Sequence, residues 1–481
     1  PYSYHENESL FSELVKIKSS NDFSLPLKNH FIPTNPKVPK RNVQKQVIPK
    51  LIVDSNGSKL YFEKDYEFLR PKGVVSYKIL FPERNMDIFR HVKLKMYSLS
   101  VKESMNELGY PAKLAGLNYS LQEGYEGLYL DISGYKESSL KLYESMLDHM
   151  VDFKISEEQF SAIKDKVIRD YKNTPLTDAY RQVREMNAEI NHNVKFSWDE
   201  CVKVVQNLTL KEIQSFSKSI YKDVFVEGFV YGDYKEHEAK ETLDLFKEKT
   251  KYKGLSRDEA FELDYLSHEE SEIIQYVKKL DVNNSCFWRE YDLGSDSPEI
   301  RAASMIIRKI IDQPFYTEMR TNQQLGYIVW SFTSNRDKKH FISFVIQSGA
   351  YPADELERRA ANYIAKLPQV FKEIDLEKFN KVVASSIEQL EKEPKSISER
   401  ANSFKNLAFN YDADFERDSK TIEALKDLEK KDVERLFSRT ISPDTHRVIN
   451  TLGFAKQHDN KSKSKTSFEQ LSKWKSTKSY K

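Results

Sequence analysis

The sequence is poor in cysteine, in apolar runs and in net charge. Among its 481 residues only Cys201 and Cys286 are cysteines, which is too few for a disulfide framework, so we expect a reducing compartment such as the cytoplasm. The 76 Lys and Arg residues nearly balance the 74 Asp and Glu residues, and the net charge is +2. No overall field therefore directs the chain to nucleic acid or to an acidic membrane. No window approaches the ~18 consecutive apolar residues of a transmembrane helix.

The first residues lack the features of a secretory leader. Pro1–Glu6 contains neither the basic region nor the apolar region of a signal peptide. It also lacks an initiator Met. We therefore expect a chain without a signal peptide that is a processed or excised piece of a longer protein.

Complete catalytic motifs are also missing. Hydrolytic zinc sites on helices use two His four residues apart with a Glu beside them, and no two of the ten histidines have that spacing. His237-Glu238 and His268-Glu269-Glu270 come nearest, and both are expected to be exposed. The sequence contains neither an HxxEH nor an HExxH motif. It also contains no CxxC, GxSxG or P-loop motif. The chain alone thus carries no complete catalytic site and no metal ligands.

Strands and helices alternate along the rest of the chain. Strand patterns occupy 59–63 and 73–81, a hairpin pattern covers 117–133, and helical patterns follow at 136–152, 156–172 and 177–193. These patterns predict an α/β (α+β) fold. We expect five segments, which are a connector at 1–44, a first α/β unit at 45–250, a linker at 251–264, a second α/β unit at 265–456 and a Lys-rich tail at 457–481.

The two units are predicted to be homologous because their patterns recur in the same order. Phe153-x-Ile155-Ser156-x-x-Gln159-Phe160 matches Phe371-x-x-Ile374-Asp375-x-x-Lys378-Phe379. Ser156 and Asp375 both stand where a helix N-cap belongs. Later matches align Leu208 with Leu428 and Tyr231-Gly232 with Leu452-Gly453. Each unit is expected to be a mainly antiparallel sheet packed with helices.

The tail has two interpretations. Lys residues dominate it from Lys456 to Lys481, against Asp459 and Glu469. The simpler interpretation is a solvated, frayed end, and the alternative is a basic patch for a polyanion or a partner.

The segment Arg320–Trp330 is the most suggestive of function. Arg320 and Tyr327 offer donors suited to peptide carbonyls and oxyanions, and Gly326 allows close approach of two backbones. The structural alternatives are an Arg320 paired with Glu318 or Asp312, and a Tyr327 in the core at the start of a strand.

Several motifs resemble the insulysin and pitrilysin (M16) family of zinc metallopeptidases. The resemblance covers about residues 20 to 455, and it is carried by Phe315–Val329, Phe344–Ser348, Lys28–Asn35, Lys59–Lys72 and Leu114–Gln122. Members of this family have four homologous domains in two halves that close around a chamber. The chain resembles the third and fourth domains, which implies that the zinc ligands and the HxxEH motif belong to the other half.

The resemblance also implies roles for single residues. Tyr327 would donate to the substrate carbonyl oxygen at the zinc site of the partner half, and Arg320 with Gly326 would hold the substrate backbone. Expected partners are an N-terminal catalytic half bearing HxxEH, peptide substrates and a possible second copy in a dimer, with neither nucleic acid nor membrane. The loop Thr333–Lys339 is more charged than in typical relatives, which leaves substrate specificity open.

Two further interpretations stay open. The chain could be a catalytically dead relative that serves as a structural or assembly subunit, or a module that binds extended peptides by strand addition. The Arg320–Tyr327 pair favours a peptidase half, since a scaffold has no use for an oxyanion donor.

Overall fold

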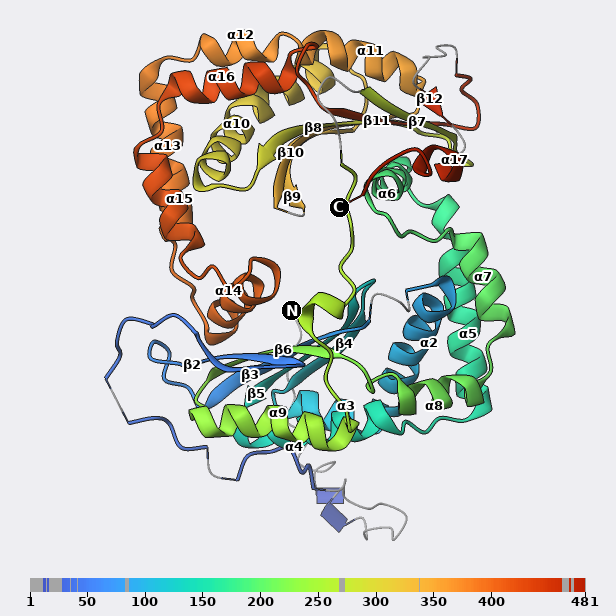
Figure 1. The fold of residues 1–481 in the computed structure, drawn as a ribbon, viewed down its shortest axis with the longest axis vertical. Helices are drawn as coiled ribbons and strands as arrows, with labels where there is room; N and C mark the ends of the chain where they lie inside the picture. Colours follow the sequence, from blue (N-terminus) through green and yellow to red (C-terminus); the bar gives the residue numbers. More distant parts are fainter. Residues whose placement is uncertain are drawn as a thin grey trace.

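The computed structural model describes residues 12–13, 15–16, 28–34, 36–40, 42–82, 86–267, 273–336, 338–460, 467–468 and 471–480. Its two sheets lie at opposite ends of the molecule, with helices around the rim and with α6 and α14 between the sheets (Figure 1). Over the described residues, no helix is long and apolar enough to cross a membrane.

The first unit runs from β1 to α9. Its strands and helices are β1 Lys50–Ser55, β2 Ser58–Lys64, β3 Lys72–Leu80, α2 Ile88–Ser104, α3 Asn106–Leu114, β4 Asn118–Glu123, β5 Gly127–Tyr135, α4 Lys136–Val151, α5 Glu157–Lys172, α6 Ala179–Asn191, α7 Trp198–Asn207, α8 Leu210–Ser219, β6 Phe225–Gly232 and α9 Glu236–Thr250.

The second unit runs from β7 to α17. Its strands and helices are β7 Ile273–Lys279, β8 Ser285–Ser295, α10 Pro298–Tyr316, a π-helical turn Thr317–Asn322, β9 Ile328–Arg336, β10 Lys339–Ser348, α11 Ala353–Ile364, α12 Leu367–Lys372, α13 Leu376–Glu391, α14 Ile397–Asn410, α15 Arg417–Lys426, α16 Lys430–Ile441, β11 Val448–Phe454, β12 Ser467–Phe468 and α17 Leu471–Lys475.

Five strands of each sheet have the same arrangement, and the sixth differs, because β1 pairs antiparallel with β2 whereas β12 pairs parallel with β7. The first sheet has the order β1-β2-β6-β3-β5-β4, and the second has the order β12-β7-β11-β8-β10-β9. In both, a parallel pair (β2 with β6, β7 with β11) joins a set of antiparallel strands. The fold class predicted from the sequence, two mainly antiparallel sheets packed with helices, is therefore confirmed.

Local signals place most helix starts. Ser156 caps α5, and its hydroxyl accepts from the Gln159 amide at 3.1 Å. Asp375 caps α13 and accepts from the Lys378 amide at 2.7 Å. The sequence interpretation missed α7 and α9, although a Ser197–Glu200 capping box marks the start of α7.

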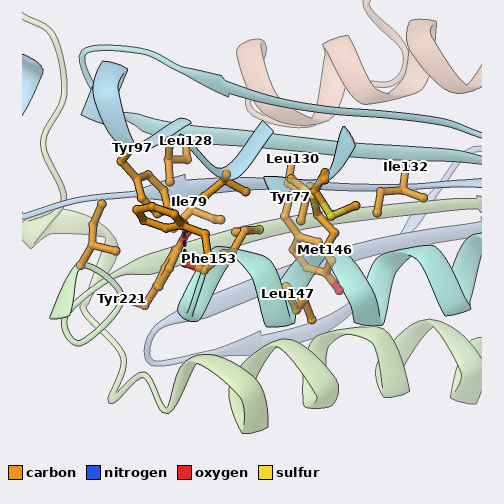
Figure 2. Close-up of a cluster of buried hydrophobic side chains, with 14 of the residues drawn as sticks. Tyr77, Ile79, Tyr97, Leu128, Leu130, Ile132, Met146, Leu147, Phe153 and Tyr221 are labelled. Carbon is orange, nitrogen blue, oxygen red and sulfur yellow. Dashed lines mark hydrogen bonds between the residues drawn. The ribbon is translucent and has the colours of Figure 1, made fainter. Parts of the chain in front are cut away.

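Buried tyrosines are prominent in the core of the first unit (Figure 2). Tyr97 on α2 donates to the Met150 carbonyl at 2.7 Å and lies 2.5 Å from the Tyr221 hydroxyl. Tyr77 on β3 lies 2.7 Å from the Thr242 hydroxyl. Burial raises the pKa of all three phenols, so they stay neutral. Each hydroxyl has the partner that a buried polar group requires.

Each unit covers the sheet of the other with one helix. Helix α6 of the first unit packs Val183, Met186 and Ile190 against Ile274 and Trp288 of the second sheet. Helix α14 of the second unit reciprocates, with Ile397, Ala401 and Phe404 against Val74 and Tyr231 of the first sheet. Figure 1 shows α6 beside the second sheet and α14 beside the first, each on the side that faces the other sheet. We call this arrangement the helix exchange.

Polar contacts lock both exchanged helices. On α14, the Arg400 guanidinium donates to Glu67 at 3.0 Å and the Lys405 ammonium to Asp131 at 2.6 Å. At the start of α6, the Gln347 side-chain oxygen accepts from the Tyr180 amide at 2.8 Å.

The described part of the tail is not a frayed end. Residues 471–480 pack on the end of α6, where the Tyr480 hydroxyl donates to the Ile190 carbonyl at 2.9 Å and Lys475 donates to the His192 carbonyl at 2.6 Å. Leu471, Trp474 and Tyr480 join the apolar cluster around α6. The prediction of a solvated end is wrong for these residues, because their apolar side chains find a surface that only the folded chain provides.

The helix exchange predicts that one substitution on α14 destabilises both units. Phe404 is 6% exposed and packs edge-on against Tyr231 at 5.8 Å. Phe404→Ala should lower the free energy of unfolding by ~3–5 kcal/mol, measured by urea denaturation. The matched control Phe89→Ala, at a side chain that is 56% exposed, should change it by less than ~0.5 kcal/mol. Equal effects of the two variants would contradict the packing.

Two buried histidines predict acid sensitivity. Burial, followed by the nearby Lys95 and Lys195, lowers the pKa of His91 to about 4, and burial with Lys195 and Arg336 does the same for His192. The unfolded chain takes up these protons near pH ~6.5, before the folded chain does. Stability should therefore be full above pH ~6.5 and fall as the pH drops toward ~4, by roughly 2–3 kcal/mol per histidine.

Denaturation measured between pH 7 and pH 4 tests this expectation. His91→Phe keeps a flat ring against Tyr125, whose ring centroid lies 4.8 Å from that of His91, but removes one titrating group. Its stability should depend less steeply on pH than that of the parent chain. A parallel dependence would exclude His91 as a source of the acid sensitivity.

Candidate functional site

The candidate site is the turn that leads from α10 into β9. The last turn of α10 continues as a π-helical turn, a rare form that often occurs at functional sites. The Gln323 amide donates to the Glu318 carbonyl and the Leu325 amide to the Met319 carbonyl, both at 3.0 Å. Met319 and Leu325 are buried and anchor the turn in the core.

Gly326 is required by packing. A Cβ atom at this position would lie 1.9 Å from the Gln347 carbonyl oxygen on β10. The expected close approach of two backbones is therefore confirmed, and the loop is pressed against the sheet one residue before Tyr327. A direct contact of Gly326 with substrate stays a prediction.

Arg320 lies between two aromatic rings. Its guanidinium carbon is 4.4 Å from the centre of the Tyr327 ring and 5.3 Å from that of Tyr316, and Nη1 donates to the Tyr327 carbonyl. Stacking on both rings and the bond to the main chain hold the guanidinium in one place. Its other N–H groups form no hydrogen bond with a described residue, so donors remain for a ligand.

Arg320 does not form the ion pair with Glu318 or Asp312 that was its structural alternative. Glu318 accepts instead from the Asn322 side chain at 2.8 Å and from the Gln323 side chain at 2.9 Å. These two bonds lower the pKa of Glu318. Asp312 accepts from the Ser331 hydroxyl at 3.0 Å. Within the described chain Arg320 forms no ion pair, so its charge is not used up by a structural carboxylate.

Tyr327 is not a core residue. Its side chain is 81% exposed, and its hydroxyl makes no hydrogen bond with any described residue. A large ring that is held at its backbone and presents a donor to solvent is suited to contact another molecule. The structure thus brings Arg320, Gly326 and Tyr327 together on one exposed turn.

A cavity of about 700 Å³ lies at the other end of β9, between the two units. Asn335 and Arg336 of β9 line it together with Lys78 and Tyr129 of the first sheet. Arg336 donates to Glu290 at 2.9 Å, and Asn335 donates to the Tyr411 hydroxyl at 2.7 Å. The lining is polar and carries charges of both signs.

One carboxylate holds the wall of this cavity. Asp296 accepts from Arg301 at 3.0 Å, from Arg417 at 2.7 Å and from the His340 ring at 2.6 Å. Partial burial would raise the pKa of Asp296, but the three donors outweigh it and hold the pKa well below its usual range. Burial lowers the pKa of His340, so this ring is neutral at pH 7 and donates to the carboxylate. Sequence reasoning missed this cluster because its members come from three separate segments, at 296–301, 340 and 417.

The residues that the structure describes do not fit a zinc ion. Among the described residues no group of three His, Cys, Asp or Glu side chains could hold a metal ion. Glu238, beside His237, accepts from Lys136 at 2.7 Å. His268-Glu269-Glu270 lies outside the described residues.

Two family models match separate parts of the chain. A model described as "Middle or third domain of peptidase_M16" matches residues 1–204, and one described as "PQQ synthase PqqF-like, C-terminal lobe domain 4" matches residues 306–405. Part of the chain therefore resembles the third domain of M16 peptidases, and another part resembles a fourth domain of a related peptidase lobe.

Individual relatives are similar to the chain over most of its length. The chain is similar to insulin-degrading enzyme from Homo sapiens, with 26% identity over 92% of this chain and 44% of the relative. It is also 25% identical to a relative from Schizosaccharomyces pombe that is named as a zinc protease, over 92% of this chain and 46% of that protein. Its fold matches pitrilysin with a TM-score of 0.85 and 20% identity, over 95% of this chain and 49% of that one. The chain thus spans about half the length of these relatives.

The crowding at Gly326 predicts that the site loop tolerates no side chain there. Gly326→Ala should displace the turn from β10 and lower the free energy of unfolding by ~1–3 kcal/mol, measured by thermal denaturation. In the control Gly349→Ala, the new Cβ meets the Asn284 side-chain oxygen at 3.0 Å, which a flexible side chain can relieve. The control should therefore cost less, and the reverse order would contradict the geometry.

Proposed function

We propose that this chain is the non-catalytic half of a zinc metalloendopeptidase that encloses and cleaves peptides. The chain would form part of the chamber wall and supply substrate- and oxyanion-binding groups to a zinc site in an N-terminal half. The single observation that carries the proposal is an exposed Tyr327 hydroxyl, without a hydrogen bond to any described residue, beside an Arg320 guanidinium held by stacking. The match of residues 1–204 to an M16 family model and the similarity to about half of each relative support it.

Each residue has a definite task in this proposal. The Tyr327 hydroxyl would donate to the carbonyl oxygen of the scissile peptide as negative charge develops there. The free N–H groups of Arg320 would hold neighbouring main-chain carbonyls of the substrate. Because Arg320 is bonded to the Tyr327 carbonyl, the two groups are positioned together and little reorganisation is needed on binding.

The chemistry that this chain lacks would come from its partner. Zinc, its HxxEH ligands and the general base would reside in the N-terminal half, so the chain alone should hold no stoichiometric zinc and should be inactive. The division into units at 45–250 and 265–456, a possible dimer and a cytoplasmic location remain parts of the proposal. Both cysteines are free and buried, which suits a reducing compartment.

The proposal predicts a large effect of one oxygen atom. This chain is mixed with an HxxEH-bearing N-terminal half, and hydrolysis of a fluorogenic peptide is followed. Tyr327→Phe should lower kcat by about 10²–10³-fold, the usual effect of losing one oxyanion donor. The matched control Tyr110→Phe, at a side chain that is 69% exposed on α3, should leave kcat unchanged. Full activity in a folded Tyr327→Phe variant would rule out the donor role.

A second candidate is a family member that has lost catalysis and serves as a structural subunit or peptide-binding module. A solved structure described as a "peptidase M16 inactive domain" from Pseudomonas fluorescens shares the fold, with a TM-score of 0.62 and 11% identity. The same mixing experiment separates the candidates. A subunit of this kind would give no hydrolysis with any HxxEH-bearing half, and Tyr327→Phe would change nothing.

A further inference from the structure

Strand β9 is an unprotected edge of the second sheet. All nine of its residues, Ile328–Arg336, pair with β10 on one side, and no described strand pairs with its other side. Edge strands are usually protected by proline, by lysine or by being very short. Strand β9 has no proline, and its one charged residue, Arg336, is bound to Glu290. Its outer edge therefore offers main-chain donors and acceptors to another extended chain.

An aromatic surface lies beside this edge. Trp330 of β9 is 42% exposed, and its ring meets that of Tyr180 edge-on at a centroid distance of 5.1 Å. Tyr180 comes from α6 of the first unit and is held by Gln347. On the same face of β9, two residues further along, Phe332 packs against Trp288 at 5.4 Å. The Arg181 guanidinium donates to the Tyr180 hydroxyl at 3.0 Å, so the Tyr180 ring is held in place while part of the Trp330 ring stays exposed.

Strand β9 runs from the Arg320–Tyr327 turn to the cavity between the units. The strand begins directly after Tyr327, beside Arg320, and ends at Asn335 and Arg336 in the cavity between the units. Nine residues at ~3.3 Å each make a track of roughly 30 Å. A peptide lying along this track would connect the Arg320–Tyr327 turn to the cavity.

We propose that the outer edge of β9 binds an extended peptide substrate by strand addition, and that the Trp330–Tyr180 pair receives one large apolar side chain of that peptide. This inference rests on the proposed function, because it takes the peptide to be the substrate held at Arg320 and Tyr327. Main-chain pairing supplies affinity without sequence preference, and the aromatic pair adds preference for an aromatic or large aliphatic residue. Trp330 is a specificity-determining residue, and the charged cavity receives the polar remainder of the chain.

The test uses the present chain alone and a fluorescein-labelled, uncharged peptide of about twelve residues with Phe at alternate positions, a length that covers β9. Binding is followed by fluorescence anisotropy. Trp330→Ala should weaken binding about tenfold, as expected for the loss of one aromatic contact. The matched control Trp198→Ala, at a side chain that is 39% exposed on α7, should bind like the parent chain.

Changes in the peptide test the proposal without altering the protein. N-methylation of alternate peptide amides removes main-chain donors and should weaken binding at least tenfold, and Phe→Ala replacement in the peptide should match the effect of Trp330→Ala. Unchanged binding of the N-methylated peptide would overturn strand addition, and unchanged binding by Trp330→Ala would overturn the aromatic subsite. A third outcome would be a molecular mass that doubles as the protein concentration rises. If Trp330→Ala abolished this doubling and added peptide did not affect it, β9 would pair with a second copy of the chain, and the proposal would be overturned.

The proposed function and the β9 proposal can be rejected independently of each other. Tyr327→Phe should lose hydrolysis in the presence of an HxxEH-bearing half, whereas Trp330→Ala is judged by peptide binding to this chain alone. Intact hydrolysis in Tyr327→Phe would reject the donor role and leave the binding result standing. Loss of hydrolysis in Tyr327→Phe, with no effect of Trp330→Ala on binding, would reject only the β9 proposal.

Discussion

The structure depends on the reciprocal exchange of α6 and α14. Each sheet has an apolar inner face that its own unit leaves uncovered, and a helix of the other unit covers it. Burying one large apolar side chain contributes ~1.5–3 kcal/mol, so each helix contributes several such increments. Pulling the units apart would expose both faces at once and would break the Arg400–Glu67 and Lys405–Asp131 ion pairs. The two helices thereby hold the two units together.

The candidate site inherits its rigidity from this exchange. In the first turn of α6, the Tyr180 amide donates to the side-chain oxygen of Gln347 on β10. The carbonyl of the same Gln347 is the group against which Gly326 is pressed, one residue before Tyr327. Contacts therefore run without interruption from helix α6 of the first unit, through strand β10 of the second sheet, to the exposed turn. Such positioning matters for a group that stabilises a transition state, because its benefit is lost if the group must reorganise during the reaction.

Local sequence signals were sufficient for most of the fold. The caps Ser156 and Asp375, the alternation in the β4–β5 hairpin and the recurrence of patterns predicted elements that the structure has, because caps and strand periodicity act over a few residues. Helix α7 was missed although its capping box was present. The tail was misjudged because its many lysines suggested a solvated end, whereas Trp474 and Tyr480 pack on α6.

The sequence by itself showed the family resemblance, the recurrence of patterns and the absence of an HxxEH motif, and it singled out Arg320, Gly326 and Tyr327 as candidate site residues. Each of these is written in a short stretch of chain or in its repetition. Only the tertiary structure decided that Arg320 is stacked between tyrosines rather than paired with Glu318, that Tyr327 is exposed, and that Trp330 meets Tyr180. These contacts join residues from different segments and different units, and their energies exist only once the sheets and the exchanged helices are assembled.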